Sequence, residues 1–204
     1  MNRRLFLHTS LLAAAGATLT SSIAQAVEGK VGKISPAEFK KINTEAGAKL
    51  AAIKTTSDAL SEADAKLLTE IALGGIMQLE MSRAALASAT SDDVRAIAHA
   101  EVQEQTGLSA KLKEIAAAKG ARLPVAPDEK TNQAVTKLEK KTGAEFDREY
   151  LKESGVDGHQ LMQKTMEKVQ STAADATLKR LASTALPLIQ KHLEVSREEM
   201  KDVG

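Results

Sequence analysis

Residues 120–143, GARLPVAPDEKTNQAVTKLEKKTG, separate two pairs of long helical patterns and determine how those patterns connect. Pro124 and Pro127 interrupt any helix at the start of this stretch, because proline lacks the backbone N–H that a helix interior needs. Residues 129–141 have the spacing of a short amphipathic helix. A connection of this length indicates a crossover between two parts of a fold, not a hairpin turn.

Four long segments flank this connection, and each repeats apolar residues every three to four positions, the spacing of one buried helical face. They cover about 61–89, 93–119, 144–170 and 175–201. Within each pair the segments are joined by about four residues, and short loops of this kind join antiparallel neighbours. Two hairpins joined by one long crossover are the connectivity of ferritin-like bundles. We therefore predict an all-α, ferritin-like four-helix bundle over residues 60–204.

The composition favours the same fold class and excludes several functions. Aromatic residues make up only 2%, whereas sheet cores are rich in aromatic and β-branched residues. The net charge of +1 gives no overall attraction to nucleic acid, and we expect no nucleic-acid partner. The chain has no cysteine, which excludes disulfides, thiolate metal sites and cysteine nucleophiles.

Residues 1–26 have the pattern of a secretory signal. Arg3 and Arg4 precede a short apolar run, and an Ala-x-Ala sequence ends at Ala26, after which we expect cleavage. The run is too short to span a bilayer, so the mature chain is expected to have no transmembrane segment. The Arg3-Arg4-x-Phe6-Leu7 core is similar to a twin-arginine export signal, and an ordinary secretory signal is the alternative. Either route predicts a periplasmic protein.

Residues 27–59 form a lead and one accessory helix. Ser35-Pro36-x-Glu38 has the pattern of a capping box with proline at the first helical position. The apolar residues that follow fall on one face, and the helix is expected to end near Thr55: Phe39, Ile42, Ala46, Leu50 and Ile53. The pattern leaves open whether this helix packs on the bundle or contacts another protein.

Polar residues interrupt or flank the apolar faces of the four long segments. They are Gln78, Glu101, Glu104, Gln105, His159 and His192. Burying an unpaired carboxylate is costly, so such groups should be paired, hydrogen-bonded, exposed at an end of the bundle or bound to metal. We expect Gln78 and Gln105 to belong to a polar layer of the core.

These residues raise the question of two kinds of metal site. A ferritin-like dimetal site needs Glu-x-x-His steps, which the chain lacks; Glu101-x-x-Glu104 has the spacing but not the histidine. A single transition-metal ion is a second hypothesis, with ligands from His159, His192, Glu80, Glu101 and Glu104. The simpler interpretation is that these groups form hydrogen bonds and ion pairs without a cofactor.

Several short motifs recur in a defined order between about residues 60 and 200. They are Leu60-Ser61-x-x-Asp64, Gly74-Gly75 with Leu79-Glu80, Ala116-Ala117-Ala118-Lys119-Gly120 with Leu123-Pro124, Phe146-Asp147-x-x-Tyr150, Gly158-His159, and Leu186-Pro187-x-Ile189-x-x-His192-Leu193. In order and spacing they resemble the bacterial domain-of-unknown-function 4142 family, whose members are exported and often labelled predicted outer membrane proteins. The resemblance implies a ferritin-like helical domain.

The resemblance also implies roles for some polar residues. His159 and His192 match histidines of the family's later helices. The family often has Glu at the position of Gln78, and an acidic residue followed by His at the position of Glu104-Gln105, so half of that constellation is altered here. The family has no established activity that could be transferred to this chain.

Two functional hypotheses follow. The first is a non-enzymatic periplasmic bundle that acts in envelope maintenance or stress through contacts with an unknown protein partner, and a homo-oligomer is compatible with it. It is based on export and on the lack of a recognisable catalytic arrangement. The second is a metal-binding or metal-sensing bundle that uses His159, His192 and nearby carboxylates.

Overall fold

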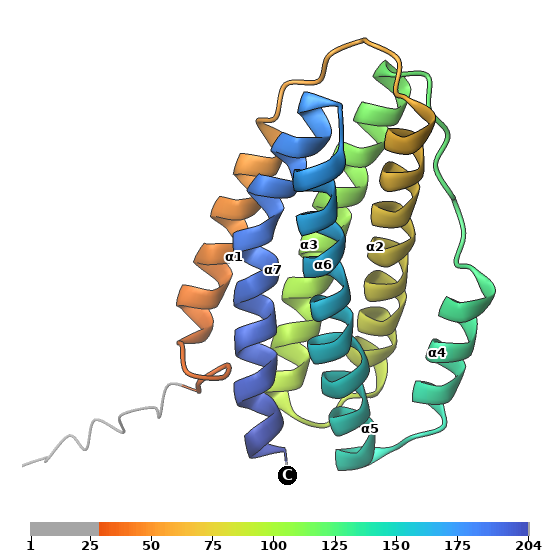
Figure 1. Ribbon diagram of the computed structural model, residues 1–204. Coiled ribbons are helices and arrows are strands. Elements are labelled where there is room, and N and C mark those ends of the chain that lie inside the picture. Colours follow the sequence, from red (N-terminus) through yellow and green to blue (C-terminus); the bar gives the residue numbers. More distant parts are fainter. Residues whose placement is uncertain (1–28, 204) are drawn as a thin grey trace, which may run out of the picture.

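The computed structural model describes residues 29–203, and the regular elements in that range are helices (Figure 1). The predicted signal sequence and its cleavage point after Ala26 lie outside the described residues. In chain order the elements are α1 (Pro36–Ala51), α2 (Glu62–Ser88), α3 (Asp92–Ala118), α4 (Glu129–Glu139), α5 (Gly143–Tyr150), the π-helical segment η1 (Leu151–Gly158), α6 (His159–Thr172) and α7 (Ala176–Asp202). The all-α prediction is confirmed.

Local capping explains where these helices begin. At the starts of α1, α2, α3, α4 and α7, the N-cap side chain accepts a hydrogen bond from the backbone N–H three positions later; these N-cap residues are Ser35, Ser61, Ser91, Asp128 and Asp175. These bonds satisfy N–H groups that the first turn of a helix leaves without partners. Of the two bonds in the capping box predicted for α1, the structure shows the one in which the Ser35 hydroxyl accepts from the backbone N–H of Glu38.

The helices form two antiparallel hairpins, α2–α3 and α6–α7, joined by a crossover that contains α4 (Figure 1). The crossover descends along the outside of the bundle, so that α3 and α6 run in the same direction. This is the predicted ferritin-like connectivity. Helix α1 packs against α3 and α7 as a fifth helix, which is the first of the two alternatives that its sequence left open.

An aspartate from a distant element holds the turn of each hairpin. Asp147 of α5 accepts hydrogen bonds from the backbone N–H groups of Thr90 and Ser91, at 3.0 and 2.9 Å, in the turn between α2 and α3. Asp64 of α2 accepts bonds of 3.0 Å from the N–H groups of residues 174 and 175, in the turn between α6 and α7. These contacts of Asp147 and Asp64 fix the register of one hairpin along the other.

The apolar core consists of two clusters with a polar layer between them. On α3, for example, Ile97 belongs to one cluster and Leu108 to the other, and the polar residues of 101–105 lie between them. On α7, Ile189 and Val195 flank the layer in the same way. The register of the two hairpins therefore brings the polar interruptions of separate helices to one level of the bundle.

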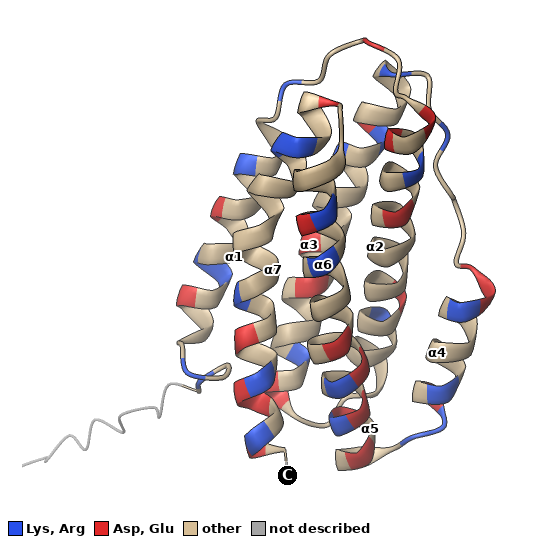
Figure 2. Ribbon diagram, viewed as in Figure 1, with Lys and Arg blue, Asp and Glu red and all other residues tan. Residues whose placement is uncertain are grey.

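The surface carries charges of both signs on the outer faces of the helices (Figure 2). This distribution agrees with the small net charge of +1. Within residues 29–203, no helix has both the length and the apolar character that crossing a bilayer requires.

Candidate metal centre

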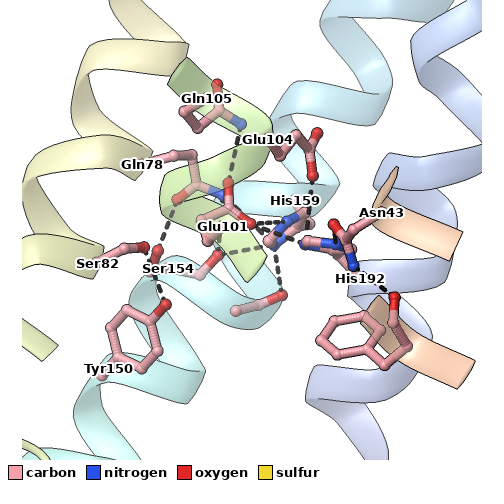
Figure 3. Close-up of polar contacts among 12 residues, drawn as sticks. Asn43, Gln78, Ser82, Glu101, Glu104, Gln105, Tyr150, Ser154, His159 and His192 are labelled. Atoms are coloured by element: carbon pink, nitrogen blue, oxygen red, sulfur yellow. Dashed lines mark hydrogen bonds and ion pairs between the residues drawn. The ribbon is translucent and has the colours of Figure 1, made fainter. Parts of the chain in front are cut away.

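Four buried titratable side chains meet in the polar layer (Figure 3): Glu101, Glu104, His159 and His192. Glu101 and Glu104 project from one face of α3, His159 begins α6, and His192 lies in α7. One nitrogen or carboxylate oxygen from each residue lies within 4.8 Å of those of the other three. None of the four residues is more than 7% exposed. The structure thus brings together four of the five residues expected to bind a metal.

Glu80, the fifth expected ligand, does not reach this cluster. Its carboxylate pairs with Arg83 at 2.7 Å, and its side chain is 30% exposed. Residues two positions apart point to different sides of a helix, so Glu80 cannot share the inward direction of Gln78. We therefore correct the ligand set and exclude Glu80 from it.

The position of the proton on His159 follows from its backbone contacts. Its Nδ1 lies 2.9 Å from the carbonyl oxygen of Gly155 and 3.1 Å from that of Ser154. Because a carbonyl oxygen only accepts hydrogen bonds, Nδ1 must carry the proton. The other nitrogen, Nε2, then faces Glu101 Oε2 at 2.9 Å.

His192 is held in the same manner by a side chain of α1. The Asn43 amide nitrogen donates to the carbonyl oxygen of Phe39 at 2.9 Å, which directs the Asn43 oxygen toward His192. That oxygen lies 2.8 Å from His192 Nε2, so Nε2 carries a proton and donates it. Nδ1 of His192 consequently faces Glu101 Oε2 at 2.9 Å and Glu104 Oε2 at 3.3 Å.

Both imidazoles therefore present an inner nitrogen to the carboxylates, and both have an outer N–H that donates to a fixed acceptor. This is the arrangement of metal-binding histidines, whose second nitrogen usually donates to a carbonyl or carboxylate oxygen. An inner nitrogen with a lone pair would repel the carboxylate oxygen 2.9 Å away. A positive charge, either a proton or a metal ion, is needed between them.

The π-helical segment η1 supplies the acceptors for His159, and the sequence did not predict it. We expected a regular helix from about 144 to 170. Instead, η1 ends at Gly158, immediately before His159, and the carbonyl groups of Ser154 and Gly155 contact the imidazole. A π-helical turn is wider than an α-helical one and is frequent at functional sites. A Cβ atom on Gly155 would lie 2.9 Å from Ser196 of α7, so glycine allows this close approach.

The two glutamines expected in the polar layer complete the hydrogen bonds around the cluster. Gln105 donates from Nε2 to Glu101 Oε1 at 2.8 Å. Gln78 donates to the Ser154 carbonyl at 3.2 Å and accepts from the Ser154 hydroxyl at 2.7 Å. Both glutamines are 2% exposed. They hold Glu101 and η1 in place without adding charge.

The environment of the cluster lowers the pKa of Glu101 and raises the pKa values of Glu104 and His159. Burial tends to raise the pKa of Glu101, but the charge of His159 and the charge and hydrogen bond of His192 outweigh it and hold the pKa below its usual value. Burial, reinforced by the charge of Glu101, raises the pKa of Glu104 to about 7. Burial opposes protonation of His159, yet the carboxylates of Glu101 and Glu104 raise its pKa to about 9. The cluster therefore attracts positive charge strongly.

Two buried oxygen atoms of the polar layer, Glu104 Oε2 and Gln105 Oε1, have no hydrogen-bond partner among residues 29–203. His159 Nε2 is close to Glu101 but is not aligned for a hydrogen bond with it. Leaving such an atom unpaired costs about 1–3 kcal/mol. Two imidazole nitrogens and two carboxylates are a suitable ligand set for a divalent ion such as Zn²⁺ or Fe²⁺. The residues present thus fit a metal ion.

Replacing Gly158 by alanine is expected to destabilise the protein by about 1–3 kcal/mol, the usual range for overpacking. A Cβ atom there would lie 2.6 Å from Gln78 Oε1, so the carboxamide would have to leave its bonds to Ser154. The matched control is Gly107→Ala in α3, where a Cβ meets nothing within 4 Å. That variant should gain about 0.5–1 kcal/mol from higher helix propensity. Urea unfolding of both variants measures the difference, and equal effects would show that Gly158 has no role at Gln78.

The fold and the cluster define an all-helical bundle with a buried histidine–carboxylate centre. The chain belongs to the family described as Domain of unknown function (DUF4142), whose model matches residues 49–198. The resemblance found in the sequence is thereby confirmed. No curated protein and no solved structure matches the chain. The matched range contains the four cluster residues, whereas Asn43 precedes it.

Two residues that support the cluster were missed by the sequence analysis, Asn43 and Ser154. Asn43 lies one turn after Phe39 on the buried face of α1 and is 4% exposed. A polar residue on an otherwise apolar face was the signal that could have identified it. Ser154 gave no such signal, because its position depends on the π-helical turn.

Proposed function

We propose that the protein is an exported metal-binding helical bundle that holds one divalent transition-metal ion between Glu101, Glu104, His159 and His192. The observation that carries the proposal is the common direction of the two inner imidazole nitrogens, which both lie 2.9 Å from one carboxylate oxygen. Their outer N–H groups already donate to acceptors outside the cluster. The ligand atoms of the four residues lie within 4.8 Å of one another, which is close enough for them to share one ion.

The charge of the cluster supports one ion instead of two. Two carboxylates and two neutral imidazoles balance a single divalent ion. A second ion would leave two positive charges buried without partners, which is strongly unfavourable. The side chains that adjoin the cluster, Gln78 and Gln105, are neutral and add no compensating charge. The absence of Glu-x-x-His steps from the sequence agrees with this stoichiometry.

The proposed role is binding or sensing of the ion, with catalysis not required. The four ligands are at most 7% exposed, so a substrate of ordinary size has no direct access to them in this conformation. The twin-arginine-like sequence at Arg3 and Arg4 supports export to the periplasm and agrees with a protein that folds around its ion before export.

We prefer this function to envelope maintenance through an unknown protein partner. A buried pair of carboxylates facing two imidazoles is costly for a bundle that only contacts other proteins. Metal binding gives that arrangement a purpose, and the partner hypothesis does not explain it.

The test uses the untagged mature chain recovered from the periplasm, its metal content, and calorimetric titration of the metal-free protein with Zn²⁺ at about pH 7. We expect one ion per chain. At a free concentration 100-fold above Kd the ion should stabilise by about 2.7 kcal/mol, a rise in Tm of roughly 5–10 °C for a chain of this size.

The variants identify the ligands. His159→Ala combined with His192→Ala should abolish binding, whereas His99→Ala, which removes an exposed histidine of α3, should bind normally. Recovery in the cytoplasm alone would contradict export. No bound ion, or loss of binding in His99→Ala, would contradict the metal centre.

A further inference from the structure

A pocket of about 300 Å³ lies between α2, α4 and α6. Its walls are largely apolar, with Leu73 and Met77 from α2 and Leu161 and Met162 from α6. Helix α4 stands outside the four main helices (Figure 1) and contributes Thr131 to the outer wall. Leu161 is 50% exposed, although large apolar side chains of the described residues are otherwise mostly covered.

The inner end of the pocket adjoins the polar layer. Gln78 and Gly158 both line it, and Gln78 also contacts Ser154 and His159. A side chain on Gly158 would displace the Gln78 carboxamide, so glycine keeps that group at the inner end of the pocket. The side chain of Gln78 therefore contacts both the pocket and His159 of the cluster.

The size and lining of the pocket indicate the class of molecule that fits. An apolar cavity of about 150 Å³ is enough to hold benzene, and small-molecule sites begin at about 300 Å³. The sulfur atoms of Met77 and Met162 favour an aromatic ring, because thioethers make favourable contacts with rings. The charged lining residues are Glu70, Asp128 and Lys130, whose mixed signs do not favour an anion. A peptide helix is too large for this volume.

We propose that this pocket binds a neutral molecule the size of one aromatic ring, with a polar group directed at Gln78, and that Gln78 couples its occupancy to the metal centre. The binding part of the proposal does not depend on the metal, because the pocket is complete without one. The coupling part rests on the proposed metal function. Gln78 cannot turn toward a ligand without loosening its bonds to Ser154, and Ser154 belongs to the turn that holds His159.

The probe is phenol, and the protein is the metal-free mature chain with ¹³C-labelled methionine methyl groups. Met77 and Met162 line the pocket, whereas Met81 and Met166 are buried elsewhere in the core and serve as internal controls. We expect saturable NMR shifts at Met77 and Met162 that follow one binding curve. Shifts that do not saturate, or that are equal at Met77, Met162, Met81 and Met166, would overturn the proposal.

Two variants locate the site of binding. Leu161→Trp should fill the pocket and weaken phenol binding at least 10-fold. Val125→Trp places the same side chain at a site that is 95% exposed in the crossover and outside the pocket, so its affinity for phenol should match that of the unmodified chain. Unchanged binding in Leu161→Trp would also overturn the proposal.

The coupling is measured by repeating the titration with Zn²⁺-saturated protein. We expect the affinity for phenol to change at least 2-fold, the affinity for Zn²⁺ to change by the same factor in the presence of phenol, and both effects to vanish in Gln78→Ala. Equal phenol affinities with and without Zn²⁺ would overturn the coupling. If the chain binds phenol but no Zn²⁺, the proposed metal function fails and the pocket assignment stands.

Discussion

Glu101→Gln is expected to weaken Zn²⁺ binding at least 100-fold and to destabilise the metal-free protein by about 3–5 kcal/mol, the usual cost of removing one partner from a buried ion pair. Glu101 is fully buried, and its Oε2 faces the inner nitrogens of His159 and His192 at 2.9 Å each. Glutamine keeps the shape of the side chain but removes the charge that both histidines require. The imidazoles would then be left with Glu104 alone.

Calorimetric Zn²⁺ titration and urea unfolding with a chelator measure the two effects. The matched control is Glu80→Gln, the same substitution at a carboxylate of α2 that pairs with Arg83 near the surface. Pairs of this kind contribute about 0–1 kcal/mol, and Glu80 is not a ligand of the centre. Similar losses in the two variants would contradict the assignment of Glu101 as the central carboxylate.

The stability of the metal-free protein is expected to decrease as pH rises toward 9. His159 has a pKa of about 9 in the folded protein, against 6.5 for an unperturbed histidine. Between these values the folded state binds more protons than the unfolded state, so the free energy of unfolding falls with increasing pH. The contribution of His159 is complete below about pH 6.5 and its loss is on the order of 3 kcal/mol.

The two carboxylates of the cluster act at lower pH. The pKa of Glu104 is raised from 4.5 to about 7, so its contribution also declines as pH rises through this interval. The pKa of Glu101 is lowered, so its contribution is present above about pH 4.5 and is lost as the solution becomes more acidic. The cluster should therefore stabilise the metal-free protein most at about pH 5.

Zn²⁺ should reverse the alkaline part of this dependence, because metal ligands must lose their protons before they bind. Urea unfolding at about pH 5, 7 and 9, with chelator and with saturating Zn²⁺, measures how the free energy of unfolding depends on pH without and with the metal. The stabilisation by Zn²⁺ is expected to increase with pH, and His159→Asn should lack the slope between about pH 6.5 and 9. An unchanged slope in that variant would show that His159 is not the group responsible.

Most of the fold could be predicted because helices and connections leave local signals. Apolar periodicity and the lengths of the connections predicted two hairpins and a crossover, and the capping pattern at Ser35 placed the start of α1. Four ligands were predictable for a related reason. A carboxylate or histidine on an apolar face, as at Glu101 and His192, is costly unless something compensates for its burial.

The remaining features depend on contacts between distant segments. The contacts of Asp64 and Asp147 with the hairpin turns set the register that brings His159 opposite Glu101. No local sequence pattern reveals these contacts. The π-helical turn before His159 and the bond from His192 to Asn43 have the same origin.

Glu80 is different, because helical geometry alone was enough to exclude it. Two residues on an α-helix correspond to a rotation of about 200°, so Glu80 and the inward-facing Gln78 point to different sides of α2. The wrong inclusion of Glu80 came from its nearness in sequence to the polar layer.

The most direct test of the metal centre is an anomalous difference map at the zinc absorption edge, from crystals of the Zn²⁺-loaded mature chain. We predict one peak per chain, about 2.0–2.2 Å from His159 Nε2, His192 Nδ1 and the carboxylates of Glu101 and Glu104. A map with its only peak at an exposed residue such as His99, or with two peaks inside the bundle, would contradict a single-ion centre at these four residues.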